Sequence, residues 1–540
     1  MHGLFDIVQR HGREQPDAVA ISRKRSDGTW ETTTYHDLAS LAARYATEIE
    51  ALAPSGAVVP LLLSRSAHCV AAVLGAGVTG RVFACVSTRL RSPQIAAIIR
   101  KCGSQVALID GAGLLALRGA ASADEIRGSK WFLIREQKWS KAHGTVLAQL
   151  RSVAFVEELG PRVPLSPVTR RGGGGEGPAC CLFTSGSTGG PKGVLVTDGE
   201  LLERAKAEAH LFRLTAADTV LSILPFSFVV GLNQLAAALW AGAETALLDS
   251  WLPGDILRAA RDREVTGVTG VPTIWQDFLN GGFRFDRTNG HAALRYVTVS
   301  GGDLARSHLD RLTDLGSGIE IYKTYGSSEA FRAAALRPSE FAAHRYSVGR
   351  EAPGTRVYIL RQDGSLARPG ERGEVVVSGL GLMMGYLGDE DTATKLRPNP
   401  FRGKEDGSAW AVYSGDLGFL DEQGYLHIEG RMDDMLKILG NRVYPQEIRA
   451  EILAVEGVQE AEVLPLKDPN GQSKLAAFVV TSGSSQLDAG TLRRQVAERV
   501  PSYMLPEIFR FYDRLPRTLN GKVDRTALVN DVVAVVGEDR

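Results

Sequence analysis

The segment from residue 178 to residue 325 alternates short runs of β-forming residues with amphipathic helical patterns, and this alternation constrains the fold more than any other feature. The predicted strands cover residues 179–184, 193–197, 219–224, 243–248, 267–271 and 296–300. Helical patterns such as 201–212 and 304–315 separate most of them. The pattern predicts an α/β sheet with helices on both faces. Because ligands of such sheets bind at the carboxyl ends of the strands, the loops that follow strands are the first candidates for a site.

The remaining segments predict further units around this α/β region. Residues 1–160 also alternate strand and helix patterns, with strands at 57–63 and 106–109 and a helix that begins at 67. A Gly-rich connection at 161–178 follows, and 346–430 contains short strands with turns at Asp363-Gly364 and Gln423-Gly424. From 446 onward the pattern is helix, two strands and helix, at 446–455, 459–466, 475–480 and 489–499. We therefore predict a large N-terminal α/β domain with a small β-rich subdomain, 1–429, and a small α+β C-terminal domain, 430–540.

Composition excludes several classes of protein. Lys+Arg and Asp+Glu both number 62 in the 540 residues, so the basic excess of a nucleic-acid-binding protein is absent. No apolar run reaches the ~20 residues that span a bilayer, and the N-terminus lacks a signal-peptide pattern. The five cysteines are odd in number and irregular in spacing, which predicts reduced thiols rather than a disulfide framework. We expect a cytoplasmic protein with no membrane span and no nucleic-acid partner.

The segment from 184 to 193 has the composition of a phosphate-binding loop. It contains four glycines, four hydroxyl residues and one lysine, between two predicted strands. Glycine lets the backbone approach a ligand, and successive amides, hydroxyls and an ammonium together bind a polyphosphate. It is neither a Walker A loop nor a nucleophile elbow, while a flexible surface turn is the alternative. The candidate nucleotide-binding residues are Thr184, Ser185, Gly186, Ser187, Thr188, Gly189 and Lys192.

This loop resembles the signature loop of the adenylate-forming superfamily, which includes acyl-CoA synthetases, nonribosomal peptide adenylation domains and luciferases. Other motifs follow in the order typical of that family, from about residue 14 to residue 526. The resemblance implies ATP and Mg²⁺ as cofactors and formation of an acyl-adenylate. It also implies that residues 1–429 bind the acid and ATP, and that the mobile C-terminal domain turns on a hinge at Asp433.

Two motifs after predicted strands resemble the two walls of the family's adenine site. In the segment 325–329, the resemblance implies that Tyr325 packs on adenine, Ser328 touches the α-phosphate and Glu329 holds Mg²⁺. These roles suit the chemistry, since a flat ring stacks on a base and a carboxylate is a hard ligand for Mg²⁺. Taken alone, so short a motif is equally well explained as a turn. The residues of this site further include Gly326, Gly302 and Asp303, and Gly301 of the same segment is assigned to the substrate pocket.

Three later motifs supply the rest of the expected nucleotide site. The resemblance assigns Asp416 to the ribose hydroxyls and Arg431 to the nucleotide. It assigns Lys522, at the tip of an Asn-Gly turn, the role of catalytic lysine that bridges the acid carboxylate and the phosphate. A lysine on a loop is otherwise most often a solvated charge.

The segment expected to bind the acid departs from two family patterns. Phe228 stands where many acyl-CoA ligases have histidine, and Val229 stands where amino-acid-activating domains have aspartate. A buried ammonium without a counter-charge is costly, so an ordinary α-amino acid is disfavoured. The pocket residues Phe226, Phe228, Val229, Val230 and Val271 are apolar, which favours a lipid-like or aromatic acid. Arg332 is either part of a structural salt bridge or the partner of a second carboxylate or polar group on the substrate.

The sequence thus predicts an AMP-forming acid–thiol ligase. The acceptor is expected to be coenzyme A or the phosphopantetheine of a carrier protein that acts in trans. An amide-forming ligase or an amino-acid adenylation enzyme is the alternative. A luciferase-like oxidative enzyme and a non-catalytic nucleotide-binding scaffold are further alternatives, although the lysine and the phosphate loop that a scaffold would have lost are both present.

Overall fold

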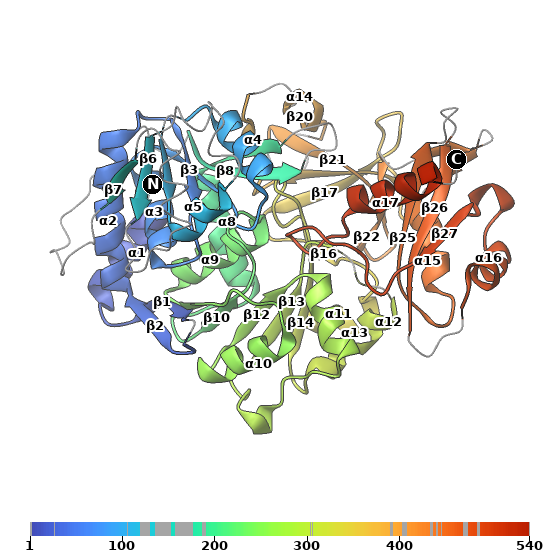
Figure 1. Ribbon diagram of the computed structural model, residues 1–540, viewed down its shortest axis with the longest axis horizontal. Coiled ribbons are helices and arrows are strands. Elements are labelled where there is room, and N and C mark those ends of the chain that lie inside the picture. Colours follow the sequence, from blue (N-terminus) through green and yellow to red (C-terminus); the bar gives the residue numbers. More distant parts are fainter. Residues whose placement is uncertain are drawn as a thin grey trace.

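The structure is a computed structural model in which a large N-terminal region and a smaller C-terminal region lie side by side (Figure 1). It describes residues 3–25, 27–104, 106–118, 130–134, 153–156, 177–185, 191–302, 304, 306–388, 392–401, 408–432, 436–438, 441–443, 445–467, 473–482 and 487–538. Within these residues, no helix has the length and apolar character that crossing a membrane requires.

One sheet of the N-terminal region, sheet A, runs in the order β16-β15-β14-β13-β12-β10-β11-β1-β2. The strands are β1 (Val19–Lys24), β2 (Trp30–Thr34), β10 (Thr219–Ser222), β11 (Glu244–Leu247), β12 (Gly267–Gly270), β13 (Tyr296–Val299), β14 (Glu320–Tyr325), β15 (Ala334–Leu336) and β16 (Arg350–Glu351). The central strands are parallel, and β2, β15 and β16 are antiparallel edges. Because β11 and β12 lie on opposite sides of β10, the strand order reverses there, which is where such sheets bind ligands.

A second sheet, sheet B, runs in the order β19-β9-β8-β4-β3-β5-β6-β7. Its strands are β3 (Val58–Leu62), β4 (Val82–Cys85), β5 (Val106–Ile109), β6 (Lys130–Ile134), β7 (Val153–Val156), β8 (Pro178–Ser185), β9 (Pro191–Thr197) and β19 (Gly385–Tyr386). Strands β9 and β19 are antiparallel to their neighbours. The strand order reverses at β3, between β4 and β5, which gives this sheet its own reversal point.

Helices form a layer between the two sheets and cover their outer faces. The middle layer contacts both sheets and consists of α1 (Leu4–Glu14), α2 (Tyr35–Leu52), α3 (Ala67–Val78), α8 (Asp198–Leu211) and α9 (Val229–Ala241). The outer elements are α4 (Ser92–Cys102), α5 (Gly111–Ala116), α10 (Pro253–Asp262), α11 (Pro272–Asn280), η1 (Arg287–Asn289), α12 (Arg306–Arg311), η2 (Leu312–Leu315) and α13 (Pro338–His344). Helix α9 is buried almost all round, which explains why its sequence is apolar on every face.

A smaller antiparallel sheet lies between the two large sheets and the C-terminal region (Figure 1). It consists of β17 (Thr355–Leu360), β18 (Gly373–Gly379), β20 (Leu396–Pro398), β21 (Trp410–Leu420) and β22 (Leu426–Arg431), with α14 (Thr392–Lys395) beside it. Gly364 and Gly424 have φ of 79° and 80°, and each lies in the turn between two paired strands. The two predicted hairpins and the β-rich character of this segment are therefore confirmed.

The C-terminal region is built on a three-stranded sheet, drawn at the right of Figure 1. Its elements are β23 (Leu436–Ile438), β24 (Asn441–Val443), α15 (Pro445–Leu453), β25 (Val458–Lys467), β26 (Ser473–Thr481), α16 (Ala489–Ala497), η4 (Ser502–Met504), β27 (Ile508–Phe511) and α17 (Arg525–Glu538). One face of this sheet packs on α15 and α16 through residues such as Val463 and Leu492, and the other on α17 through Phe478 and Leu528. The predicted large α/β region with a smaller α+β region after it is confirmed.

The predicted strands agree with the observed ones to within a few residues, whereas one predicted helix differs. The helix expected over 304–315 is instead the short helix α12 followed by the 3-10 turn η2, which ends before Gly316. All five cysteines are free and buried, as predicted for reduced thiols.

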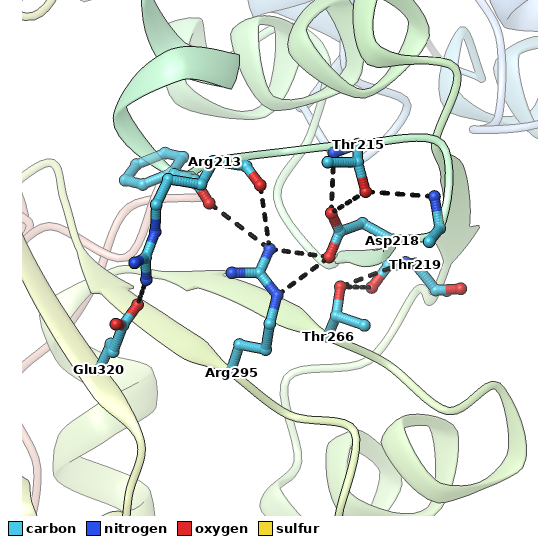
Figure 2. A network of polar contacts seen from close by, with 9 residues as sticks. Arg213, Thr215, Asp218, Thr219, Thr266, Arg295 and Glu320 are labelled. Atoms are coloured by element: carbon cyan, nitrogen blue, oxygen red, sulfur yellow. Dashed lines mark hydrogen bonds and ion pairs between the residues drawn. The ribbon is translucent and has the colours of Figure 1, made fainter.

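The amino ends of the parallel strands of sheet A are joined by a polar network (Figure 2). Asp218, which precedes β10, accepts hydrogen bonds from Arg295, which precedes β13, at 2.8 and 3.2 Å. The Arg295 guanidinium also donates to the backbone carbonyls of Phe212 and Arg213. Burial alone would raise the pKa of Asp218, but hydrogen bonds from Thr266, Arg295 and Thr215 lower it below its ordinary value. This network fixes strand position at the end of the sheet away from the cleft.

Candidate active site

The candidate site, called the cleft below, lies between the carboxyl ends of sheet A, at the reversal point between β10 and β12, and the Lys522 turn of the C-terminal region. The segment after β10 carries Phe226 and Phe228, and the segment after β12 carries Val271. A Cβ atom added to Gly301, after β13, would lie 2.9 Å from the Phe228 ring and 3.6 Å from Val271. The backbone at Gly301, with φ of 80°, therefore approaches both residues closely, as only glycine allows. The structure thus brings together the residues predicted to bind the acid.

The phosphate loop joins the paired ends of β8 and β9. Thr184 pairs with Lys192 and Ser185 with Pro191, so both ends of the loop are held at one end of sheet B. The Lys192 ammonium lies 5.7 Å from the centre of the Tyr386 ring. The predicted residues Gly186, Ser187, Thr188 and Gly189, and the side chain of Ser185, lie outside the described residues.

Tyr386 links this loop to the segment predicted to bind magnesium. Its hydroxyl donates a hydrogen bond of 2.8 Å to Oε1 of Glu329. The Glu329 carbonyl accepts from the amide of Met383 at 2.7 Å, and the Ser327 hydroxyl accepts from the amide of Glu329 at 3.2 Å. These contacts orient the carboxylate of Glu329, while Ser328 beside it is half-buried. Nothing in the sequence around Tyr386 indicated this role, because β19 joins sheet B only through non-local pairing.

Asp416 is the centre of the part of the site predicted to bind ribose. It lies opposite Arg431 on the paired strands β21 and β22, and the guanidinium donates to its Oδ1 at 2.9 Å. The Tyr325 hydroxyl donates to its other oxygen. Burial and the adjacent Asp416 carboxylate raise the pKa of Tyr325 well above its ordinary value, so the phenol stays neutral. Tyr325, Asp416 and Arg431 are thus one connected group.

The loop that carries Lys522 extends from the C-terminal region and lies against the N-terminal region. The turn closes through a hydrogen bond of 2.7 Å from the Thr518 amide to the Lys522 carbonyl. A Cβ atom added to Gly521 would lie 2.7 Å from Thr273 Oγ1 and 3.2 Å from Trp251, so the tip fits closely onto the start of α11. Beside it, Arg514 pairs with Asp277 at 2.9 Å and Arg517 donates to Gln276 at 3.1 Å.

The amine of Lys522 lies within electrostatic reach of the carboxylates of Asp416 and Glu329. The surrounding protein removes bulk water and lowers the pKa of Lys522, and the charges of Asp416 and Glu329 oppose this shift. The Lys522 side chain is nevertheless exposed to solvent, which moderates the lowering of its pKa by burial. Lys192, which follows the loop, is thus connected through Tyr386 to Glu329, and the charge of Glu329 acts on Lys522.

Arg332 is buried beside α8 rather than exposed at the candidate site. Its guanidinium is 2.9 Å from Oε1 of Glu208 on α8, and it donates to the hydroxyl of Thr324. Both charged residues are buried, and burial raises the pKa of Glu208 while Arg332 opposes the rise. Of the two predicted roles, this pairing favours the structural salt bridge. Gly302 follows β13, and a Cβ atom added to it would lie 3.3 Å from Pro272. Asp303 and Asp433 lie outside the described residues.

A cavity of about 250 Å³ adjoins the Phe226 segment. It lies at the carboxyl ends of β3, β4 and β10, where the reversal points of sheets A and B face each other. Arg65 forms its buried wall, with Nε and NH2 donating to Asp249 at 3.0 and 2.7 Å. Of the residues predicted to bind the acid, Phe226 lines this cavity.

The profile of AMP-binding enzymes matches residues 8–387, and the profile of the C-terminal domain of AMP-binding enzymes matches residues 447–522. The first match covers more than half of the chain. The chain belongs to the AMP-binding enzyme family. This AMP-binding enzyme is accordingly a member of the adenylate-forming superfamily, which confirms the resemblance found in its sequence. Among the described residues, no group of three acidic, histidine or cysteine side chains is placed to hold a metal ion.

Relatives of this AMP-binding enzyme include CoA ligases and peptide synthetases. Indoleacetate–CoA ligase of Aromatoleum aromaticum is 28% identical over 96% of both chains. Bacitracin synthase 3 of Bacillus licheniformis is 30% identical over 65% of this chain, which spans only 5% of that much longer protein. Among solved structures, the anthranilate CoA ligase AuaEII in complex with anthranoyl-AMP superposes with a TM-score of 0.79 at 20% identity, over 99% of this chain and 98% of that one.

Proposed function

We propose that this AMP-binding enzyme is an acid–thiol ligase that forms an acyl-adenylate and transfers the acyl group to coenzyme A or to the phosphopantetheine of a carrier protein. The observation that carries the proposal is the Lys522 turn, whose tip at Gly521 packs on Thr273 of the N-terminal region and brings Lys522 within electrostatic reach of Glu329 and Asp416. The Lys522 cation, near the carboxylates proposed to bind magnesium (Glu329) and ribose (Asp416), would lie where the carboxylate of the acid approaches the α-phosphate of ATP. The full-length similarity to a CoA ligase supports a thiol acceptor, and the peptide-synthetase relatives support a carrier protein as its form.

In the first half-reaction, a carboxylate oxygen of the acid attacks the α-phosphorus of ATP. The bond from that phosphorus to the bridging oxygen breaks, and pyrophosphate leaves with the bonding electrons. Lys522 holds the carboxylate against the phosphate, and Lys192 with the loop amides binds the departing pyrophosphate. Magnesium, when bound at Glu329, neutralises phosphate charge. Tyr325, Asp416 and Arg431 hold the nucleoside in place.

In the second half-reaction, the acceptor sulfur forms a bond to the acyl carbon while the bond from that carbon to the phosphate oxygen of AMP breaks. The thiol loses its proton, and AMP leaves. Lys522 has to withdraw before the thiol can enter, and we propose that the C-terminal region turns at Asp433 to allow this. The contacts that hold the Lys522 loop are suited to this because the Arg514–Asp277 pair is exposed, and exposed ion pairs stabilise little.

The test measures pyrophosphate release from Mg·ATP across a panel of alkyl and aryl carboxylic acids, followed by acceptor assays with coenzyme A, a phosphopantetheinylated carrier protein and simple amines. We expect acid-dependent pyrophosphate release and a thioester product. Absence of acid-dependent release with folded enzyme would refute adenylation. An amide as the sole product would retain adenylation and replace the thiol acceptor with an amine.

A further inference from the structure

A stripe of charged residues runs along the buried side of α8. Glu200, Arg204 and Glu208 follow one another at intervals of four residues, so they lie on one side of the helix. Arg204 is 0% exposed and Glu208 is 1% exposed. Because arginine and glutamate are almost never buried so completely unless they are paired, the partners of this stripe indicate what it holds in place.

The backbone of Gly381 is bound by two members of this stripe. Its amide donates to Oε2 of Glu200 at 2.8 Å, and its carbonyl accepts from NH2 of Arg204 at 2.6 Å. The same carbonyl accepts from the amide of Phe331 at 2.9 Å. Gly381 has φ of 83°, and a Cβ atom added to it would lie 3.2 Å from Cβ of Phe331. Both polar groups of this glycine are thus fixed, at a position that a larger residue would strain.

The ring of Phe331 is the second contact of the Arg204 guanidinium. The guanidinium carbons of Arg204 and Arg332 lie 5.5 and 4.9 Å from the centre of this ring. Among the described residues, Nε and NH1 of Arg204 make no hydrogen bond, so the carbonyl of Gly381 and the Phe331 ring are its main contacts. Arg332 in turn pairs with Glu208. Helix α8 therefore holds residues 331–332 and residue 381 at the same time.

The two segments that α8 holds carry the contacts of Glu329. Phe331 lies two residues after Glu329 in the chain. Gly381 lies two residues before Met383, whose amide donates to the Glu329 carbonyl at 2.7 Å. The Tyr386 hydroxyl binds Oε1 of Glu329, which leaves Oε2 for a hard cation such as Mg²⁺. A displacement of either segment would therefore change the orientation of this carboxylate.

Helix α8 also connects these segments to the strand that follows the phosphate loop. The helix begins at Asp198, directly after β9, and β9 carries Lys192. The amide of Met384 donates to the carbonyl of Leu195 on β9 at 2.8 Å, and β19, which contains Tyr386, pairs with β9. Strand β9, helix α8 and the segment around residue 381 are therefore one connected unit beside the candidate site.

Resting on the function proposed above, in which Glu329 holds magnesium, we propose that Arg204 is a positioning residue. Together with Glu200 it clamps the backbone of Gly381, and this clamp holds the carboxylate of Glu329 in the orientation that binds the magnesium of Mg·ATP. Because Arg204 is completely buried, it acts through the backbone and not by contact with a ligand. Loss of the clamp would weaken metal binding without changing the residues that touch the metal or the nucleotide.

An effect of charge alone makes a different prediction. Burial lowers the pKa of Arg204 to about 10, and the charges of Glu200, Cys180 and Glu329 oppose this shift, so the guanidinium is a cation at neutral pH. Through charge alone, removal of this cation would strengthen the binding of a divalent metal nearby, and removal of the Glu200 anion would weaken it. The clamp predicts instead that both removals weaken it.

The experiment measures by calorimetry the dissociation constant of α,β-methylene-ATP, an analogue that cannot release pyrophosphate, once with EDTA and once with excess magnesium. The ratio of the two constants measures how much the metal contributes to binding, and it cancels effects on the nucleotide alone. We expect Arg204→Met and Glu200→Ala each to lower this ratio by about threefold to tenfold, since even direct outer partners of metal ligands contribute about tenfold to a hundredfold.

A second measurement detects the clamp without any ligand. Hydrogen exchange followed by mass spectrometry should be faster in Arg204→Met and Glu200→Ala than in the wild type, in peptides that cover residues 329–332 and 381–384. The amides of Phe331 and Met383 donate within this region, so they report directly on the backbone that the clamp holds.

Arg81→Met is the matched control. Arg81 is also a buried arginine, 7% exposed, and donates to the carbonyl of Ala53 at 2.7 and 2.9 Å, but it lies at the amino end of β4. This variant should unfold at a lower temperature and keep the wild-type ratio. If Arg204→Met does not fold, the half-buried Glu200 still tests the clamp: Glu200→Gln, which loses the charge but keeps an acceptor oxygen, should retain the ratio that Glu200→Ala loses.

A ratio that rises in Arg204→Met, a ratio that stays at the wild-type value in Glu200→Ala, an equal fall in Arg81→Met, or unchanged hydrogen exchange would overturn the inference. Each of these results would leave acyl-adenylate formation standing, because that reaction is tested separately by acid-dependent pyrophosphate release from the wild type. Absence of this release with every acid would overturn the proposed function, and the role of the clamp in magnesium binding with it.

Discussion

The two ends of sheet A carry polar networks that are organised in different ways. At the amino ends, Asp218 and Arg295 lie next to β10 and β13, and each charge is paired by a neighbouring segment of the same sheet (Figure 2). Near the carboxyl ends, Glu329 follows β14 and Asp416 lies on β21 of the smaller sheet, and both carboxylates act on the charge of Lys522, which belongs to the C-terminal region. A network whose charges are all paired within one sheet holds its strands in position. When the charges come from two regions, the regions can bind a ligand between them and then move apart.

The side chains between these networks follow the same division. At the amino end, Arg213 pairs with Glu320 at the first position of β14, so even the exposed charges are engaged with the sheet. At the carboxyl end, the contact of Tyr386 orients the carboxylate of Glu329 without neutralising it, because the tyrosine donates only a neutral hydrogen bond, whereas Asp416 receives a hydrogen bond from Tyr325 and also pairs with Arg431. The comparison predicts that variants at the cleft change activity, whereas variants at the opposite end change stability.

The largest expected effect is that of Lys522→Ala. Loss of the cation that joins carboxylate and phosphate should lower the rate of acid-dependent ATP–pyrophosphate exchange by about a hundredfold to a thousandfold, with little change in thermal unfolding. Lys474→Ala is the matched control, since Lys474 pairs with Glu507 at 2.9 Å on the C-terminal sheet. Exchange that survives in Lys522→Ala at the wild-type rate would remove the cleft from the mechanism.

The second prediction concerns the opposite end of the sheet. Asp218→Asn should lower the free energy of unfolding by about 2 kcal/mol, because Arg295 loses its counter-charge next to a buried side chain but keeps part of its solvent contact. Activity per folded molecule should stay at the wild-type level. Urea unfolding monitored by fluorescence measures the first quantity, and pyrophosphate exchange at low temperature measures the second.

Asp262→Asn serves as the control for this variant, because Asp262 forms a more exposed ion pair with Lys24, at 3.1 Å, and its loss should have less effect on stability. A large loss of activity in folded Asp218→Asn would break the proposed division between the two ends.

A smaller effect is expected for Tyr386→Phe. Removing the hydroxyl that donates to Glu329 leaves the ring beside Lys192 in place, so about a threefold to tenfold fall in kcat is expected. The loss should be accompanied by a higher magnesium requirement, since the carboxylate is no longer oriented. A titration of rate against magnesium distinguishes this positioning role from a general loss of packing, which would lower the unfolding temperature and leave the magnesium dependence unchanged.

The smallest effect is a difference in acid stability. Because the pKa of Asp218 in the folded protein lies below the ordinary value of 3.8, its ionised form stabilises the fold at pH above that value. This contribution is lost as the pH falls through the lowered pKa. The stability difference between wild type and Asp218→Asn should therefore be constant at neutral pH and shrink below about pH 4. A difference that instead grew with acidification would contradict the assigned pairing.

Local patterns were sufficient for the strands of sheet A and for the positions of the motifs. The predicted strand at 296–300 corresponds to β13, and the Gln423-Gly424 turn lies between β21 and β22, because period-two alternation and turn residues act over a few neighbouring positions. The helix predicted over 304–315 was too long, since the apolar spacing persists through α12 and the 3-10 turn alike. The assignments of Glu329, Asp416 and Lys522 rested on motifs read in order, and they remain proposals about chemistry.

The partners of buried polar groups could not be predicted in this way. Arg332 and Glu208 are 124 positions apart in sequence, by the difference of their residue numbers, and meet only because α8 packs on the face of sheet A below β14. Tyr386 reaches Glu329 because β19 pairs with β9. Such contacts depend on which faces of distant elements meet, and no local pattern of residues encodes that.

The amino-acid sequence by itself determined the alternating α/β organisation and the loops at which a nucleotide would be handled, since propensity, hydrophobic period and turn chemistry are local properties of the chain. Only the tertiary structure decided that Arg332 is neutralised by Glu208 and that Tyr386 orients Glu329. The reason is physical: the state of a charge or a hydroxyl in the interior depends on the groups that folding places around it, and those groups come from remote segments.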